Sequence, residues 1–293
     1  MLALLWSILT TPIALIMSYA AESKLLMVLV SCTMALIFIL NIQAGCTICN
    51  GLIESLSSIN CHISKRQLER QPSPINIVRS LVHQRRQPCP LFWHNYYELP
   101  QAVLLENNGS TVIMRIACAP ELTPHLSGIE PSENYYFEEA TFKWGMLESE
   151  HSIDSLKFAL EMQVLHRTNL ANANCKFLTI SYLFSILEHN KILGQVVDNL
   201  EAIVVPGSCI ELPPFDLGSL VRPFDSGYYT YHGTYDNGGT VLPTKWLIYS
   251  RTFGMSLTQL RRFGELCTHD GSRIAGNARK TQPLGNRCVQ YQN

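Results

Sequence analysis

The chain has 293 residues, of which 47% are hydrophobic, and its acidic and basic side chains nearly cancel to a net charge of −1. This length allows one large domain of roughly 200 to 250 residues together with additional segments. The sequence has no basic stripe, so its charge gives no support to nucleic-acid binding.

Two apolar runs open the chain. Residues 1–21 carry no charge, and residues 25–41 follow Glu22 and Lys24. The first run has the length of about 20 residues that a membrane span needs, and the second lies near the lower limit. Either run is alternatively a signal peptide, and a start at Met27 would leave only a signal-like segment. We therefore expect membrane association or entry into the secretory pathway through residues 1–45, with the side of the membrane left open.

Residues 46–70 are predicted to form a polar linker. The linker contains Cys46 and Cys49 at a redox-like or metal-like spacing, but the sequence has no second Cys-x-x-Cys. We interpret these two cysteines as a lipidation site next to the membrane or as a pair without a function.

Residues 71–293 alternate short segments of β-branched and aromatic residues with turns, which predicts a mostly β domain. The strands expected on this basis are residues 111–116, 135–143, 160–166, 177–187 and 245–250. The expected helices are few, and they comprise residues 154–158, 192–200 and 258–266, the last with Ser256 as its cap.

Sequence motifs extend over the whole of this domain. In chain order they read QPSPINI (71–77), LLENNGSTVIMRI (104–116), FEEATFKWGMLESEHSIDSLKFALEMQVLHRTN (137–169), YYTYHGTYDNGGTVLPTKW (228–246), SLTQLRRF (256–263) and NARKTQPL (277–284). In order and spacing they resemble the α-class carbonic anhydrases, whose metal-binding strands read F-H-F-H-W-G, S-E-H and E-x-H-x-V-H. The resemblance implies an α+β, mostly β domain with a central, twisted, largely antiparallel sheet of about ten strands and short peripheral helices. One departure is the short loop between Gly145 and Glu150.

The metal-binding positions of the family are changed in this chain. The frame around them survives as Phe142, Trp144, Gly145, Ser149, Glu150, His151, Glu161 and His166. The resemblance places Thr141, Lys143 and Gln163 where three histidines hold the catalytic zinc of the family. None of the three is an imidazole, a lysine repels a cation, and glutamine is a weak zinc ligand. We expect no metal and no other cofactor, unless the chain is a zinc enzyme that uses different ligands.

The resemblance also assigns the residues around the former metal. Glu139 and Glu161 are expected in the second shell, behind the former ligands. Glu150 matches the residue that binds the family's gatekeeper threonine, and that threonine is Asp236 here. Two facing carboxylates are costly without a cation, so we expect Lys143 to neutralise Asp236 and Glu150 as a buried ion-pair cluster. Alternatively, these charges reach solvent.

The positions for proton transfer and for the substrate differ as well. The proton-shuttle position of the family is Ser110, which cannot carry a proton at neutral pH. The residues expected to line the former carbon dioxide pocket are Leu165, Ile180, Tyr235 and Trp246, with the tyrosine narrowing it. Exported members of the family carry a disulfide that ends on a cysteine, and Thr240 occupies that position.

The sequence therefore predicts a carbonic anhydrase-related protein without catalytic activity, associated with a membrane or exported. We expect it to act as a binding or interaction module for a protein partner that no short motif identifies. The alternatives are a working zinc carbonic anhydrase and an inactive relative whose only partner is the membrane.

Overall fold

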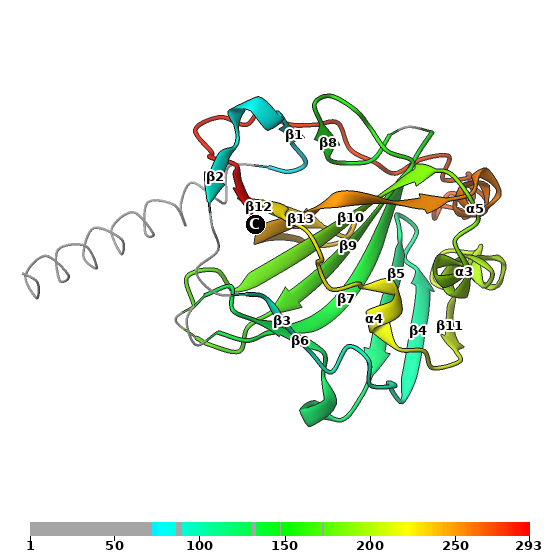
Figure 1. Ribbon diagram of the computed structural model, residues 1–293. Coiled ribbons are helices and arrows are strands. Elements are labelled where there is room, and N and C mark those ends of the chain that lie inside the picture. The colour runs from blue at the N-terminus through cyan, green and yellow to red at the C-terminus, as the bar shows by residue number, and fades with distance from the viewer. Residues whose placement is uncertain (1–71, 86–89, 131–132, 147, 172) are drawn as a thin grey trace, which may run out of the picture. The chain divides into compact units, whose positions relative to one another are not determined.

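The computed structural model describes residues 72–85, 90–130, 133–146, 148–171 and 173–293 (Figure 1). The predicted apolar segments at residues 1–21 and 25–41, the linker at 46–70 and the first residue of the predicted domain lie outside the described residues. Among the described residues, no helix has the length and apolar character of a membrane span.

A twelve-stranded sheet forms the centre of the described chain, and ten of its strands follow the order β11-β4-β5-β7-β9-β10-β13-β12-β14-β2. Their bounds are β2 His83–Arg85, β4 Ala102–Asn107, β5 Val112–Ala117, β7 Tyr135–Trp144, β9 Leu160–Arg167, β10 Phe177–Ile186, β11 Cys209–Leu212, β12 Tyr228–Asp236, β13 Val241–Met255 and β14 Gln290–Gln292. The other two strands, β3 (Phe92–His94) and β6 (His125–Ser127), pair with each other, and β6 also pairs with β7. Within the sheet only β10–β13 and β14–β2 are parallel, so the predicted mostly β, largely antiparallel sheet is confirmed.

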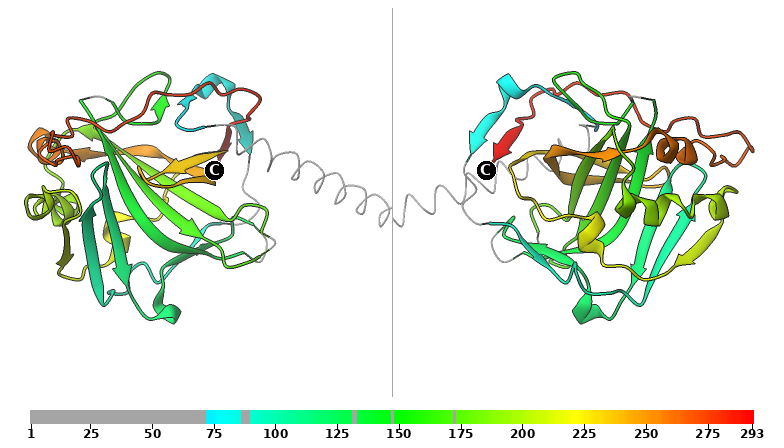
Figure 2. Two further views of the ribbon diagram at one scale, coloured as in Figure 1. Left: turned by 180° about the vertical axis from the view of Figure 1, so that it is seen from behind. Right: turned by 45° about the vertical axis from the view of Figure 1, so that its right-hand side comes forward.

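A separate two-stranded ladder joins β1 (Asn76–Ile77) to β8 (Ser152–Ile153). The last strand, β14, lies between β12 and β2, which brings an early strand and the C-terminal strand side by side (Figure 2).

The helices are short and lie at the periphery of the sheet (Figure 1). They are α3 Lys191–Val197, α4 Leu217–Leu220 and α5 Leu257–Phe263, with 3-10 turns η2 Arg79–Leu81, η3 Pro120–Leu122 and η4 Leu200–Ile203. The predicted cap of α5 is confirmed, because the Ser256 hydroxyl accepts a hydrogen bond from the Gln259 amide in a complete capping box. The ring of Phe263 lies 5.5 Å from that of Phe142 and 5.3 Å from that of Trp144, so α5 packs against β7.

The helix predicted at residues 154–158 is wrong. Asp154 and Ser155 have φ angles of 48° and 65°, in the left-handed region that an α-helix cannot use. The two residues instead form a turn, in which the Asp154 carboxylate accepts a hydrogen bond from the Arg79 amide. The helix predicted at residues 192–200 also differs, because α3 ends at Val197 and a 3-10 turn begins at Leu200.

Strand alternation divides the core into two layers, one on each face of the sheet. One layer contains Phe142, Val164 and Leu247 together with residues of the helices. The other contains Leu165, Trp246 and residues of β1 and β8. The strands β7 and β9 are buried on both faces over most of their length, so polar side chains on them lie inside the protein.

The cysteines that the structure describes are free thiols: Cys118, Cys175, Cys209, Cys267 and Cys288.

Candidate functional site

The three predicted former metal positions lie together on one face of the sheet. Thr141 of β7 pairs directly with Gln163 of β9, and Lys143 follows two residues later on β7. Residues two apart on a strand point to the same face. All three are buried, and Lys143, the most exposed of them, has only 4% of its surface accessible. The fold therefore gathers them as the resemblance implied.

Gln163 is held in one orientation by two carboxylates. Its Nε2 donates to Glu150 Oε2 at 3.0 Å and to Glu161 Oε1 at 2.9 Å. A flipped amide would place its oxygen against both carboxylates, so the hydrogen bonds fix the assignment. The Oε1 atom is left buried without a hydrogen-bond partner among the described residues.

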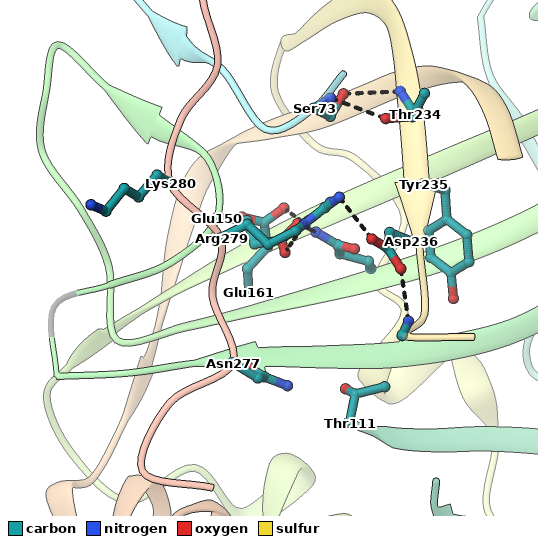
Figure 3. Close-up of polar contacts among 12 residues, drawn as sticks. Ser73, Thr111, Glu150, Glu161, Thr234, Tyr235, Asp236, Asn277, Arg279 and Lys280 are labelled. Atoms are coloured by element: carbon teal, nitrogen blue, oxygen red, sulfur yellow. Dashed lines mark hydrogen bonds and ion pairs between the residues drawn. The ribbon is translucent and has the colours of Figure 1, made fainter. Parts of the chain in front are cut away.

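The cation of the site is Arg279, and the prediction that Lys143 plays this part is wrong. Arg279 donates through Nε and Nη2 to the two oxygens of Glu150, at 2.8 and 2.9 Å, and through Nη1 to Asp236 Oδ2 at 3.0 Å (Figure 3). The planar guanidinium can serve both carboxylates at once, which the single ammonium of Lys143 cannot match in geometry. The side chain of Lys143 forms no ion pair or hydrogen bond with the described part of the chain.

The electrostatic state of Lys143 follows from this arrangement. Burial lowers its pKa, and the positive charge of Arg279 adds to the effect. The negative charges of Glu150, Asp236 and Glu161 act in the opposite direction without reversing it. The buried amine is therefore held below its ordinary pKa of 10.5.

Arg279 enters the site from the C-terminal segment. Two residues earlier, Asn277 donates to the carbonyl oxygens of Ser110 and Phe142, and its Oδ1 accepts from the Trp144 amide. In Figure 3, Asn277 and Arg279 point toward the sheet, whereas Lys280 points away. The sequence motif that contains Arg279 was recognised, but its role was missed. The sequence did contain a signal for it: two carboxylates expected to face each other, at Glu150 and Asp236, require a cation that can bind both.

Glu161 remains ionised although it is fully buried. Burial alone would raise its pKa, but the His151 side chain at 2.6 Å, the His151 amide and Gln163 lower it to about 2. His151 also contacts the Tyr231 hydroxyl through Nε2 at 2.6 Å, so both of its ring nitrogens are engaged.

Glu139 belongs to a second polar group at the edge of the site. It accepts from the Tyr235 hydroxyl at 2.9 Å, from Asn237 Nδ2 at 2.7 Å and from Arg115 Nη2 at 2.8 Å. The Tyr235 oxygen also lies 3.3 Å from Thr141 Oγ1. Tyr235 thus connects Glu139 to Thr141, a contact that was not predicted when Tyr235 was expected only to narrow the pocket.

The predicted lining of the former substrate pocket is partly wrong. Leu165, Tyr235 and Trp246 are buried in one core layer on the face of the site. Ile180 pairs with Val164 and lies in the other layer, because a shift of one residue along a strand reverses the face. The β10 residue that pairs with Leu165 is Thr179, whose hydroxyl lies 2.8 Å from that of Thr244.

Ser110, at the predicted proton-shuttle position, is exposed in the turn after β4. Its amide donates to Asn108 Oδ1 at 3.0 Å, and the Asn108 side chain also reaches the Asn237 carbonyl oxygen at 2.8 Å. This arrangement links the turn to the loop that follows Asp236.

Comparisons with known proteins agree with this architecture. The family model described as eukaryotic-type carbonic anhydrase matches residues 60–293. The chain is 27% identical over 239 residues to carbonic anhydrase 15 of Mus musculus, covering 74% of each protein. It is 26% identical over 238 residues to carbonic anhydrase 4 of Mus musculus and 23% identical over 236 residues to carbonic anhydrase 6 of Homo sapiens, covering 75% of each protein in both cases.

Proposed function

Because this chain belongs to the eukaryotic-type carbonic anhydrase family, we propose that it is a carbonic anhydrase-related protein that does not hydrate carbon dioxide and acts as a binding or interaction module. One observation carries the proposal. The positions that the resemblance assigns to the zinc ligands hold Thr141, Lys143 and Gln163, which lie side by side on one face of the sheet. Glu150 and Glu161 hold the Gln163 amide group in an orientation that leaves only its oxygen as a possible metal ligand.

The donor set does not fit zinc. Protein zinc sites are built from histidine, cysteine and carboxylate ligands, and a catalytic site needs three of them beside a water. A hydroxyl, a buried amine and an amide oxygen supply none of these, and a protonated Lys143 would repel the ion. Among the residues that the structure describes, no three histidine, cysteine or acidic side chains are grouped for metal binding.

The surrounding residues support the same proposal. The carboxylate of Asp236 is engaged by Arg279, where the family has a hydroxyl, and Ser110 has no group that titrates near neutral pH. The Tyr235 ring is fully buried on the face of the site. These positions are therefore unsuited to activating a water, moving its proton and admitting carbon dioxide.

Zinc analysis of the full-length chain tests the proposal. The protein, purified in a neutral detergent and washed with a chelator, is analysed for zinc by mass spectrometry and for carbon dioxide hydration by stopped flow. We expect no stoichiometric zinc and no hydration above the buffer rate. An equimolar zinc content together with hydration would establish the alternative, a zinc carbonic anhydrase with different ligands.

The proposed cellular location rests on the sequence of the N-terminal segment. The apolar runs at residues 1–21 and 25–41 favour a protein that is membrane-associated or that enters the secretory pathway.

A further inference from the structure

A hollow of about 340 Å³ lies between the end of β7 and α5. Its lining includes Trp144, Met146, Leu260, Arg261, Glu265 and Arg273, and we call it the α5 hollow. Trp144 and Lys143 are consecutive on β7, so the hollow lies on the face opposite the former metal positions. Its volume is at the lower end of the range of ligand pockets, and suits a single side chain better than a large molecule.

The charges of the α5 hollow are not balanced by the residues that the structure describes. Arg261 and Arg273 are exposed, and neither forms an ion pair with a described residue. The acidic residue of the lining, Glu265, is already paired with Arg262 at 3.3 Å. Beside Gly145, the exposed Glu148 adds one carboxylate near the rim. The groups at the hollow without an ion-pair partner among the described residues are therefore two guanidinium groups and one carboxylate, which leaves a net positive charge.

The apolar part of the α5 hollow is open to a partner. Met146, at the start of the short loop after Gly145, is 64% exposed, while the other two large apolar lining residues, Trp144 and Leu260, are buried. The Trp144 ring is fixed, because its Nε1 donates to the Ile274 carbonyl oxygen at 3.0 Å. The flexible thioether of the exposed Met146 can adjust its shape to an apolar side chain that enters the hollow.

We propose that the α5 hollow docks an acidic peptide segment of a partner protein. One apolar side chain of the segment enters the hollow beside Met146, and flanking carboxylates meet Arg261 and Arg273. Arginine is suited to this because its planar fork binds a carboxylate with two parallel hydrogen bonds. This inference rests on the proposed interaction role and identifies the chemistry of the partner.

The test uses the peptide Asp-Glu-Leu-Glu-Asp-amide with fluorescein attached to its N-terminal amine, and the full-length chain in a neutral detergent. Fluorescence anisotropy is measured for the wild type, for Arg261→Ala with Arg273→Ala, and for Met146→Glu. The matched control is Arg251→Ala, which removes an exposed arginine that is paired with Asp225. We expect saturable binding that weakens about tenfold or more in the double variant, weakens in Met146→Glu, falls with added salt and is unchanged in the control.

Three results would overturn the inference: no saturable binding, equal binding by the double variant, or equal binding of a peptide with lysines in place of its acids. All the altered side chains are exposed, and circular dichroism verifies that each variant is folded. Zinc content and hydration are measured separately, so failure of peptide binding removes the docking site and leaves the zinc-free assignment to its own test.

Discussion

Replacement of Arg279 by methionine should destabilise the protein strongly. The change removes two hydrogen bonds to Glu150, whose side chain is fully buried, and one to Asp236, whose side chain is 22% exposed. Removal of one partner from a buried ion pair costs about 3 to 5 kcal/mol, because the other charge stays buried without compensation. Most of this cost should come from Glu150. Asp236 is partly hydrated and keeps its hydrogen bond from the Gly238 amide at 2.8 Å.

A double-mutant cycle separates the ion pair from other effects of the substitution. Glu150→Gln removes the charge that Arg279→Met would strand, so the double variant should lose less stability than the sum of the single variants, by about 2 kcal/mol. Unfolding is measured in urea by tryptophan fluorescence, with the full-length chain in a neutral detergent. Lys280→Met is the matched control, because this neighbouring cation points away from the site (Figure 3), and its effect should stay within about 0.5 kcal/mol.

Two outcomes would refute this reasoning. A loss below about 1 kcal/mol in Arg279→Met would mean that the buried carboxylate finds another partner. Additive effects of Arg279→Met and Glu150→Gln, within about 0.5 kcal/mol, would mean that the two residues do not interact.

Three further predictions concern the amine, the metal and the N-terminus. Lys143→Met should leave stability unchanged or raise it by about 1 kcal/mol in urea unfolding, because a buried amine without an ion pair is removed. Burial lowers the pKa of Lys143 in the folded chain, so between that lowered pKa and 10.5 the unfolded chain holds a proton that the folded chain lacks. The stability of the wild type therefore rises with pH in this range, and its deficit relative to Lys143→Met should shrink as the pH approaches 10.5. A difference that stays constant with pH would contradict this. Histidine at positions 141, 143 and 163 together should restore zinc binding, measured by mass spectrometry, with poor hydration because Asp236 and Ser110 remain; full activity would contradict the interpretation of those two residues. Removal of residues 1–45 should release the protein from washed membranes into the soluble fraction, and its retention there would place the anchor elsewhere.

The fold was largely predictable because its signals are carried by ordered motifs and by strand alternation. The resemblance placed Thr141, Lys143 and Gln163 at one site, and the structure pairs Thr141 directly with Gln163 and puts Lys143 on the same face of its strand. Strand alternation explains the error at Ile180. The residue on the face of the site is Thr179, which pairs with Leu165, and the prediction was shifted from it by one residue to Ile180, which faces the opposite core layer. The helix predicted at residues 154–158 failed because its turn depends on positive φ angles that local propensity does not indicate.

The choice of cation could not be predicted from local pattern. Lys143 lies on the same face of the sheet as Thr141 and Gln163. Arg279 instead binds Glu150 from a segment outside the strands, 129 residues away in the sequence. Proximity along a strand favoured the lysine, but two carboxylates that lie apart are better served by a forked donor that enters between them. The sequence predicted that a cation must neutralise Glu150 and Asp236. Which residue supplies that cation depends on the path of the C-terminal segment in the folded structure.

The acidic groups of the site find their hydrogen-bond and ion-pair partners within the chain. Glu150 is held by Arg279 and Gln163, and Glu161 by His151, Ser181 and Gln163. In the second polar group, Glu139 is held by Arg115, Tyr235 and Asn237, and Asp236 accepts from Arg279 and the Gly238 amide. A buried carboxylate is costly unless it is paired and hydrogen-bonded, so these partners offset the cost of burying the acidic groups. The side chains of the site therefore depend on one another: the amide of Gln163 bridges Glu150 and Glu161, and Arg279 binds the carboxylate of Asp236 together with that of Glu150.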